Sequence, residues 1–135
     1  DRVIAHYREA GSFDYVSNTQ TRTYPRGMDT EVFSFTALNE SHREAAAKPE
    51  REHVTSFIYQ RPQRYRVGQV MYPEDQSRHR WTVDTVEDLE LIRRFFETLY
   101  ASKPDFTLED CLALMKKNPG WFFINAGVKQ KVYGE

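Results

Sequence analysis

The sequence has 135 residues, of which 39% are hydrophobic and 29% are charged, and its formal net charge is −1. This composition is typical of an ordinary globular domain and excludes a disordered chain. A nearly neutral chain is not expected to bind nucleic acid, because that binding depends on neutralising phosphates. No apolar stretch approaches the roughly 20 residues that cross a bilayer, so no membrane partner is expected either.

The single cysteine, Cys111, rules out an internal disulfide framework and predicts a buried, unreactive thiol. Together with the lack of a basic and apolar leader, this favours a cytoplasmic protein. Residues 1–10 have a helical pattern that stops at Gly11. Because so short a helix is marginal alone and no methionine precedes it, we expect the chain to begin inside a larger protein.

The first half of the sequence alternates β-forming and helical segments. Three strands are expected where β-branched and aromatic residues gather or alternate, at 13–18, 29–35 and 65–72. A polar, alanine-rich helix is expected over 37–47, at the surface. A further helix should start at Pro49 and run to Pro62. Its core-facing residues are predicted to be Val54, Phe57 and Ile58.

The second half predicts a short apolar strand, 81–83, and two amphipathic helices. The first helix begins at Thr85 with a capping-box pattern, and the second begins at Thr107. The core stripe of the first is predicted to be Leu89, Ile92, Phe96 and Leu99, with Phe95 beside it. That of the second is predicted to be Leu108, Cys111, Leu112 and Met115. Strands that alternate with helices predict an α/β fold.

Asp84 is the foremost candidate for chemistry. It follows the predicted strand directly, and ligands of α/β sheets gather at the carboxyl ends of strands. A carboxylate placed there suits Mg²⁺, a hard cation that takes oxygen ligands. Capping of the following helix is the alternative role, and one carboxylate does not make a metal site. Glu87 and Asp88 are expected to point along the helix.

Cationic and imidazole side chains supply weaker signals. Arg22 and Arg26 lie in a loop, where binding residues concentrate, and guanidinium groups bind phosphates and carboxylates. A solvated surface role is the alternative for each. None of the four histidines has zinc-ligand spacing, although His53 follows Arg51 in a polar cluster. No nucleophile elbow and no glycine-rich phosphate loop occurs, so these residues alone name no reaction.

Five sequence strings together resemble one family. They occupy 14–19, 22–29, 31–35, 51–55 and 81–90. They are similar to spore coat polysaccharide biosynthesis proteins of the CMP-KDO synthetase-like, acylneuraminate cytidylyltransferase-like family, and the similarity extends from about residue 3 to 131. The Tyr-Pro-x-Gly-x-Asp string at 24–29 and the Val-Asp-Thr-x-Glu-Asp string at 83–88 are specific in combination. Val86 replaces a proline that is usual in the second string.

The resemblance implies the carboxyl-terminal portion of a three-layer α/β/α nucleotide-diphosphosugar transferase fold. Residues 1–135 would form a single partial domain, from which the amino-terminal, nucleotide-binding half is absent. The implied enzyme, a homodimer, couples a sugar or sugar acid to CMP from CTP with Mg²⁺ and releases pyrophosphate, for spore coat or surface polysaccharide. The isolated chain is then expected to be inactive as a transferase.

The resemblance also implies roles for individual residues. Asp84 would be a magnesium ligand, and Arg51 and His53 would face the sugar. The loop with Arg22, Tyr24 and Arg26 would lie near the same cleft, and no catalytic residue is assigned. A glycosyltransferase of related fold is one alternative. A non-catalytic dimerisation domain is another, supported by the incomplete site and by the apolar run at 121–124.

Overall fold

The computed structural model describes residues 2–9, 11 and 13–130, and its contacts divide the chain into two compact units. Within the described residues, unit 1 contains the chain up to Tyr24 and residues 29–75. Unit 2 contains Pro25–Met28 and Gln76–Gln130. The loop predicted to approach the cleft therefore leaves unit 1 after Tyr24 and rejoins it at Asp29.

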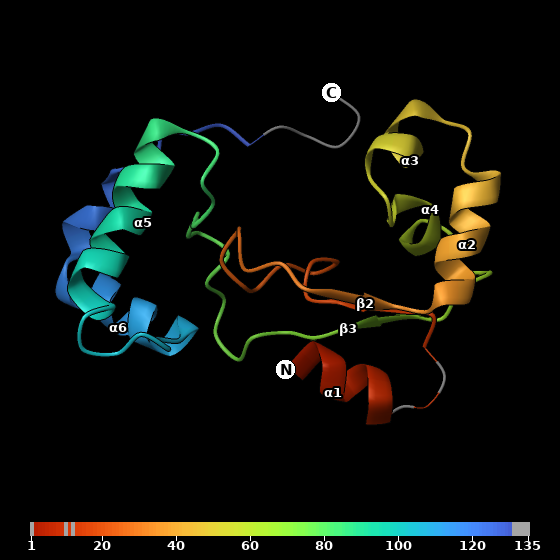
Figure 1. Ribbon diagram of the computed structural model, residues 1–135, viewed down its shortest axis with the longest axis horizontal. Helices are drawn as coiled ribbons and strands as arrows, with labels where there is room; N and C mark the ends of the chain where they lie inside the picture. The colour runs from red at the N-terminus through yellow and green to blue at the C-terminus, as the bar shows by residue number, and fades with distance from the viewer. Residues whose placement is uncertain (1, 10, 12, 131–135) are drawn as a thin grey trace. The chain divides into compact units, whose positions relative to one another are not determined.

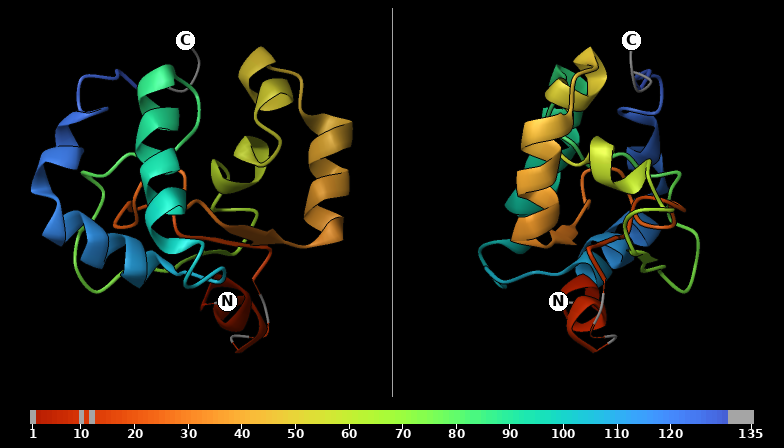
Figure 2. Two further views of the ribbon diagram at one scale, coloured as in Figure 1. Left: turned by 60° about the vertical axis from the view of Figure 1, so that its left-hand side comes forward. Right: turned by 90° about the vertical axis from the view of Figure 1, so that its right-hand side faces the viewer.

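Unit 1 is built on a small mixed sheet with the strand order β2-β1-β3. The central strand β1 (Tyr15–Ser17) is buried along its whole length. It pairs antiparallel with β2 (Glu31–Phe33) and parallel with β3 (Val67–Gln69). Helix α1 (Arg2–Glu9) lies on the opposite side of these strands from α4 (Ser56–Tyr59) (Figures 1 and 2). The three predicted strands are thus confirmed, each shorter than expected, and the fold class is α/β.

Helices α2 (Phe35–Glu44) and α4 (Ser56–Tyr59) cover the other face of this sheet. The core that they close contains Tyr15, Ala37, Phe57, Ile58 and Tyr65. Helix α3 (Lys48–Glu52) lies next to α4 and buries none of its residues.

The prediction of one helix from Pro49 to Pro62 was wrong. The chain breaks after α3, because the backbone N–H and the hydroxyl of Ser56 both donate to the carbonyl oxygen of His53, at 2.9 and 2.8 Å. Serine side chains that bind nearby carbonyls in this way compete with helical hydrogen bonding. The break leaves Val54, predicted for the core, exposed.

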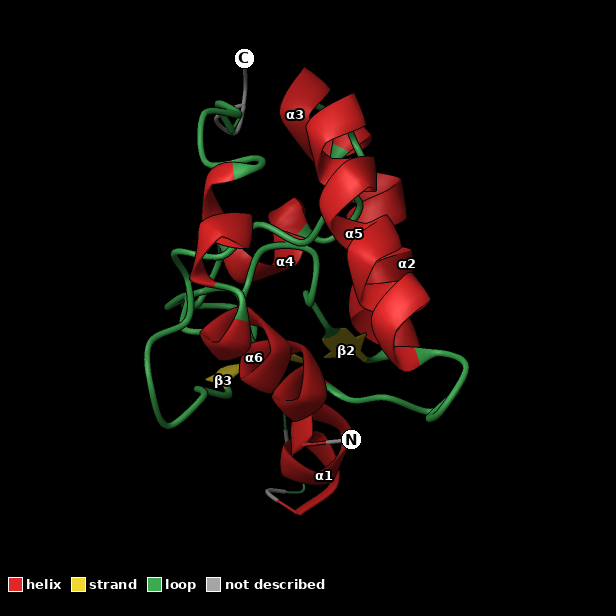
Figure 3. Cartoon of the chain, turned by 90° about the vertical axis from the view of Figure 1, so that its left-hand side faces the viewer, coloured by secondary structure: helices red, strands yellow, loops and turns green. Residues whose placement is uncertain are grey.

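Unit 2 is mainly helical (Figure 3). It contains α5 (Val86–Leu99), α6 (Leu108–Lys117) and a 3-10 helix, η1 (Pro119–Phe123). Its core consists of Trp81, Leu91, Phe95, Cys111, Leu114 and Met115. Both helices start where the sequence predicts, since the hydroxyls of Thr85 and Thr107 accept the backbone N–H three residues on. Burial raises the pKa of the Cys111 thiol to about 11, as expected for an inert cysteine.

Two predictions for unit 2 were wrong. Residues 81–83 form no strand; just before them, an isolated parallel bridge joins Arg26 and Arg80. The buried face of α5 carries Asp88, Leu91 and Phe95, whereas Leu89 and Phe96, predicted for the core, are exposed. The helix is therefore turned about its axis relative to the prediction, because its first turn buries an acidic side chain.

Gly27 fixes the loop that belongs to unit 2. Its φ is +95°, in the region that favours glycine, and an added Cβ would lie 2.4 Å from the carbonyl oxygen of Trp81. This close approach follows from the bridge, in which the Arg26 N–H donates to the His79 carbonyl and the Trp81 N–H donates to the Arg26 carbonyl. The glycine of the Tyr-Pro-x-Gly string is thus required by packing.

We expect Gly27→Ala to destabilise the protein by about 2 kcal/mol, because it combines backbone strain with a steric clash. Gly120→Ala is the matched control, since nothing lies within 4 Å of a Cβ added at that glycine. Urea unfolding monitored by tryptophan fluorescence measures both changes. Equal stability of the two variants would show that Gly27 is not constrained in this way.

Candidate functional site

Unit 1 contains an open cleft of about 790 Å³. Residues that follow β1, the strand β2 and the turn between α3 and α4 form its walls. The lining is mostly polar and includes Thr19, Gln20, Arg22, Asp29, Glu31, Glu52, His53 and Thr55. Its volume lies in the range of about 300 to 1,000 Å³ that is typical of small-molecule sites. Two of the residues predicted for the sugar site, Arg22 and His53, are brought together here.

Arg22 is held by an acid across the loop. Its guanidinium donates to both carboxylate oxygens of Asp29, at 2.5 and 2.9 Å. This hydrogen-bonded carboxylate raises the pKa of Arg22, against the opposing effect of partial burial. The bidentate pair closes the loop that leaves unit 1 after Tyr24, and it keeps the guanidinium at the cleft wall.

His53 reaches the cleft because the helix breaks there. It caps the end of α3, and its carbonyl oxygen accepts the bonds from Ser56 that begin α4. The backbone is therefore fixed on both sides of an exposed imidazole. Glu52 and Thr55, from the same turn, line the cleft beside it. The helix break that the sequence did not predict is thus what presents this side chain.

The structure places the other predicted residues elsewhere. Tyr24 is buried, with its ring edge-on to that of Tyr72 at 5.2 Å between centroids, and it does not line the cleft. Arg51 donates to the carbonyl oxygen of His42 at 3.0 Å and lines a separate hollow of about 130 Å³. Arg26 and Asp84 both belong to unit 2.

In unit 2, Asp84 is exposed and its neighbour Asp88 is not. The Asp84 side chain is 66% exposed, and its carboxylate accepts a hydrogen bond from the guanidinium of Arg80, at 2.9 Å. The Asp88 side chain has an exposed fraction of 0%. Its carboxylate accepts hydrogen bonds from Arg80 at 2.9 to 3.2 Å, from the Thr82 hydroxyl at 2.7 Å and from the Asn125 amide at 2.8 Å. It also accepts the backbone N–H of Asp84, at 3.2 Å.

These partners decide the charge state of Asp88. Burial alone would raise the pKa of this carboxyl, but the hydrogen bonds from Arg80, Thr82 and Asn125 outweigh it and hold the pKa well below its usual range. Asp88 is therefore an ionised, fully engaged structural acid. Asp84 shares the Arg80 guanidinium with Asp88 and donates its backbone N–H to it, while its own carboxylate is largely exposed.

The described residues alone do not form a metal site. Among them, no three histidine, cysteine, aspartate or glutamate side chains gather around a common point. Mg²⁺ takes about six oxygen ligands in octahedral geometry, and Asp84 offers one carboxylate. Asp84 as a magnesium ligand remains a prediction that requires oxygens from outside these residues.

The sequence reading missed the acids of the cleft and the role of Asp88. Asp29 carries a weak signal, because it follows Arg22 in the same loop. Glu31 lies in a strand and Glu52 in a helix, and nothing local indicates that they share a cavity. Asp88 occupies the third position of α5, where the capping-box pattern predicts a bond to Thr85 rather than a buried network.

Comparisons with known proteins agree with the resemblance seen in the sequence. No protein-family model matches the chain. The chain is 34% identical over 134 residues to the uncharacterized protein MJ1063 of Methanocaldococcus jannaschii. The aligned region covers 96% of this chain and 52% of that protein. It is 30% identical over 120 residues to the spore coat polysaccharide biosynthesis protein SpsF of Bacillus subtilis, with coverages of 87% and 48%.

A solved structure shows the same fold. The structure of a cytidylyltransferase from Leptospira borgpetersenii superposes with a TM-score of 0.83 at 25% identity, over 98% of this chain and 53% of that one. The chain therefore spans about half the length of the relatives it matches.

None of the helices in the described residues combines the length and the apolar character needed to cross a membrane.

We expect Asp88→Asn to destabilise unit 2 by about 3 kcal/mol, because it leaves the buried Arg80 guanidinium without its main partner. Asp84→Asn removes an exposed pair to the same guanidinium and should change stability by less than about 1 kcal/mol. Thermal unfolding of both variants at neutral pH compares them directly. A larger loss of stability for Asp84→Asn than for Asp88→Asn would show that Asp84, and not Asp88, is the structural acid.

Proposed function

We propose that this chain, a member of the SpsF-like cytidylyltransferase family, forms one half of a cytoplasmic enzyme that activates a sugar or sugar acid with CTP. In that reaction a sugar hydroxyl attacks the α-phosphorus of CTP, a new oxygen–phosphorus bond forms, and pyrophosphate leaves with the electrons of the bond that breaks. Spore coat or surface polysaccharide would be the destination of the activated sugar.

The cleft of unit 1 carries this proposal. It places Arg22 and His53, two residues that the family resemblance directs towards the sugar, on one cavity of suitable volume. Carboxylates and threonine hydroxyls supply acceptors for the many hydroxyl donors of a sugar. The proposal depends on one observation: Arg22 and His53 line the same cleft, although 31 positions separate them in the sequence.

The acidic lining of the cleft indicates which groups of a sugar it binds. Three carboxylates line it, those of Asp29, Glu31 and Glu52, against one arginine that Asp29 already neutralises. Hydroxyl groups suit this lining. A sugar acid would place its own carboxylate on Arg22 and would have to compete with Asp29 for the guanidinium.

The nucleotide and the metal are proposed to bind mainly outside this chain. No glycine-rich phosphate loop occurs in the sequence, and Asp84 would supply one oxygen to Mg²⁺ in the complete enzyme. When bound, that ion would neutralise charge on the CTP phosphates. In this proposal the residues of this chain act on the sugar alone: they bind it, orient it and exclude water around it.

A dimerisation role is a second candidate. Phe123 is 75% exposed and Val86 is 80% exposed, and Phe96 and Tyr100 continue the exposed apolar face of α5. Such a face fits a protein interface, including one between two copies of the chain. This role is compatible with the first, since a complete cytidylyltransferase of this family is expected to be a homodimer.

We expect the isolated chain to release no pyrophosphate from CTP in the presence of Mg²⁺ and a panel of sugars and sugar acids, because in this proposal the nucleotide binds mainly outside the chain. A coupled pyrophosphate assay measures this. CTP turnover by this polypeptide alone would refute the assignment of half an enzyme, and transfer from a finished sugar nucleotide would indicate a glycosyltransferase.

In a full-length cytidylyltransferase that carries this sequence, Arg22→Ala and His53→Ala should each lower kcat/KM for the sugar by about 10- to 100-fold. The KM for CTP should not change. Arg51→Ala is the control, because Arg51 lines a different hollow. An Arg51 variant as impaired as the other two would move the sugar site away from the cleft.

A further inference from the structure

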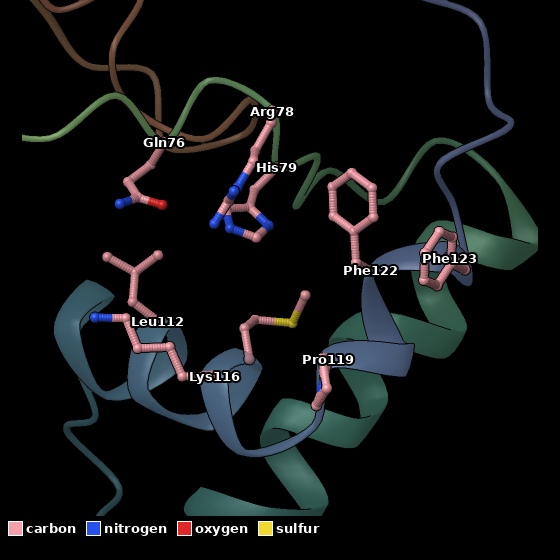
Figure 4. Close-up of a pocket in the computed structure, with 9 residues that line it drawn as sticks. Gln76, Arg78, His79, Leu112, Lys116, Pro119, Phe122 and Phe123 are labelled. Atoms are coloured by element: carbon pink, nitrogen blue, oxygen red, sulfur yellow. The ribbon is translucent and has the colours of Figure 1, made fainter.

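Unit 2 contains a second cavity, separate from the Asp88 network. It has a volume of about 320 Å³ and is lined by residues of the 76–79 segment, α6 and η1. Leu112, Met115 and Phe122 give it an apolar interior. Figure 4 shows Leu112 and Phe122 beside this space, with Arg78 and His79 on one side of it and Lys116 on the other.

The rim of this cavity is cationic. Arg78 and Lys116 line it, and no aspartate or glutamate does. Neither cation has an ion pair within the part of the chain that the structure describes. An adjoining hollow of about 150 Å³ shares Arg78 and adds Arg26 to the positive lining. Unpaired cations around a partly enclosed cavity attract an anionic group.

His79 supplies a polar group at the wall of the cavity. It is 5% exposed, and its ring contacts those of Trp81 and Phe122 at 5.4 and 5.8 Å between centroids. Its ring nitrogens are not among the fully enclosed, unpartnered polar atoms of the described residues, which are the Tyr15 hydroxyl and the Trp81 indole nitrogen. Burial, and then the charge of Arg78, lower the pKa of His79, so the imidazole is neutral at pH 7. A neutral imidazole has one N–H donor, and at the cavity wall it can donate to an acceptor atom of a ligand.

From the apolar interior, the cationic rim and the imidazole at the cavity wall, we propose that unit 2 binds a small amphiphilic anion. Arg78 and Lys116 hold a single carboxylate or phosphate group, which also accepts a hydrogen bond from His79. The apolar body of the ligand packs on Leu112, Met115 and Phe122. This site lies entirely within unit 2 and does not depend on the sugar cleft of unit 1.

Four probes test the proposal by NMR titration of the isotopically labelled chain. Hexanoate or hexyl phosphate should shift the signals of His79 and Phe122 with saturation below about 10 mM, and the tighter of the two identifies the head group. Hexan-1-ol lacks the charge, inorganic phosphate lacks the apolar body, and each should bind at least about tenfold more weakly. The proposal would be overturned if hexan-1-ol or inorganic phosphate bound as tightly as the better anion, or if neither hexanoate nor hexyl phosphate reached saturation.

Paired variants locate the site. Lys116→Ala should weaken the better anion about tenfold, whereas Lys117→Ala, the next lysine of α6, should leave its affinity unchanged because Lys117 does not line the cavity. Leu112→Trp should abolish binding by filling the space. Thermal unfolding of each variant checks that it folds. An equal effect of the two lysine variants, or binding retained in a folded Leu112→Trp variant, would place the anion elsewhere.

Discussion

The carboxylate of Asp88 is buried in unit 2 and joins segments that are far apart in the sequence. It receives hydrogen bonds from Arg80 and Thr82, which precede α5, and from Asn125, which follows η1. An ionised group out of water is strongly unfavourable unless such partners surround it, so these segments must hold their positions together. The bond from the Asp84 N–H to Asp88 then fixes the backbone at Asp84 and leaves that side chain exposed. Two acids four residues apart thus serve separate purposes, one structural and one available to a ligand.

Local signals in the sequence were sufficient for the positions at which the helices of unit 2 begin. The hydroxyls of Thr85 and Thr107 cap the two helices through hydrogen bonds to the backbone three residues on. Because each bond spans only three residues, a short stretch of sequence is enough to indicate it. The buried face of α5 was not predictable in the same way. A reading based on apolar periodicity places an aspartate outside, and here Asp88 lies inside because Arg80 and Asn125, 8 and 37 positions away, satisfy it.

The cleft of unit 1 shows the same limit. Its walls come from the segments around Arg22, Glu31 and His53, and no periodicity relates them. The family resemblance, rather than the spacing of residues, indicated that Arg22 and His53 face one site. The break before α4 depends on Ser56, whose hydroxyl competes with helical bonding, and the apolar pattern on both sides of it favoured an unbroken helix. A formal charge of −1 also conceals an acidic cleft in one unit and a cationic cavity in the other.

The ionisation of Asp88 is open to direct measurement through the NMR shift of its carboxyl carbon as the pH is lowered. Because its folded pKa lies below the unfolded value of about 3.9, the network stabilises the protein fully above that pH, and this contribution is lost as the pH falls towards the folded pKa. We expect the Asp88 signal to remain that of a carboxylate below pH 3.9 for as long as unit 2 stays folded. A titration of Asp88 at or above about 3.9 in the folded protein would contradict the buried, ionised network.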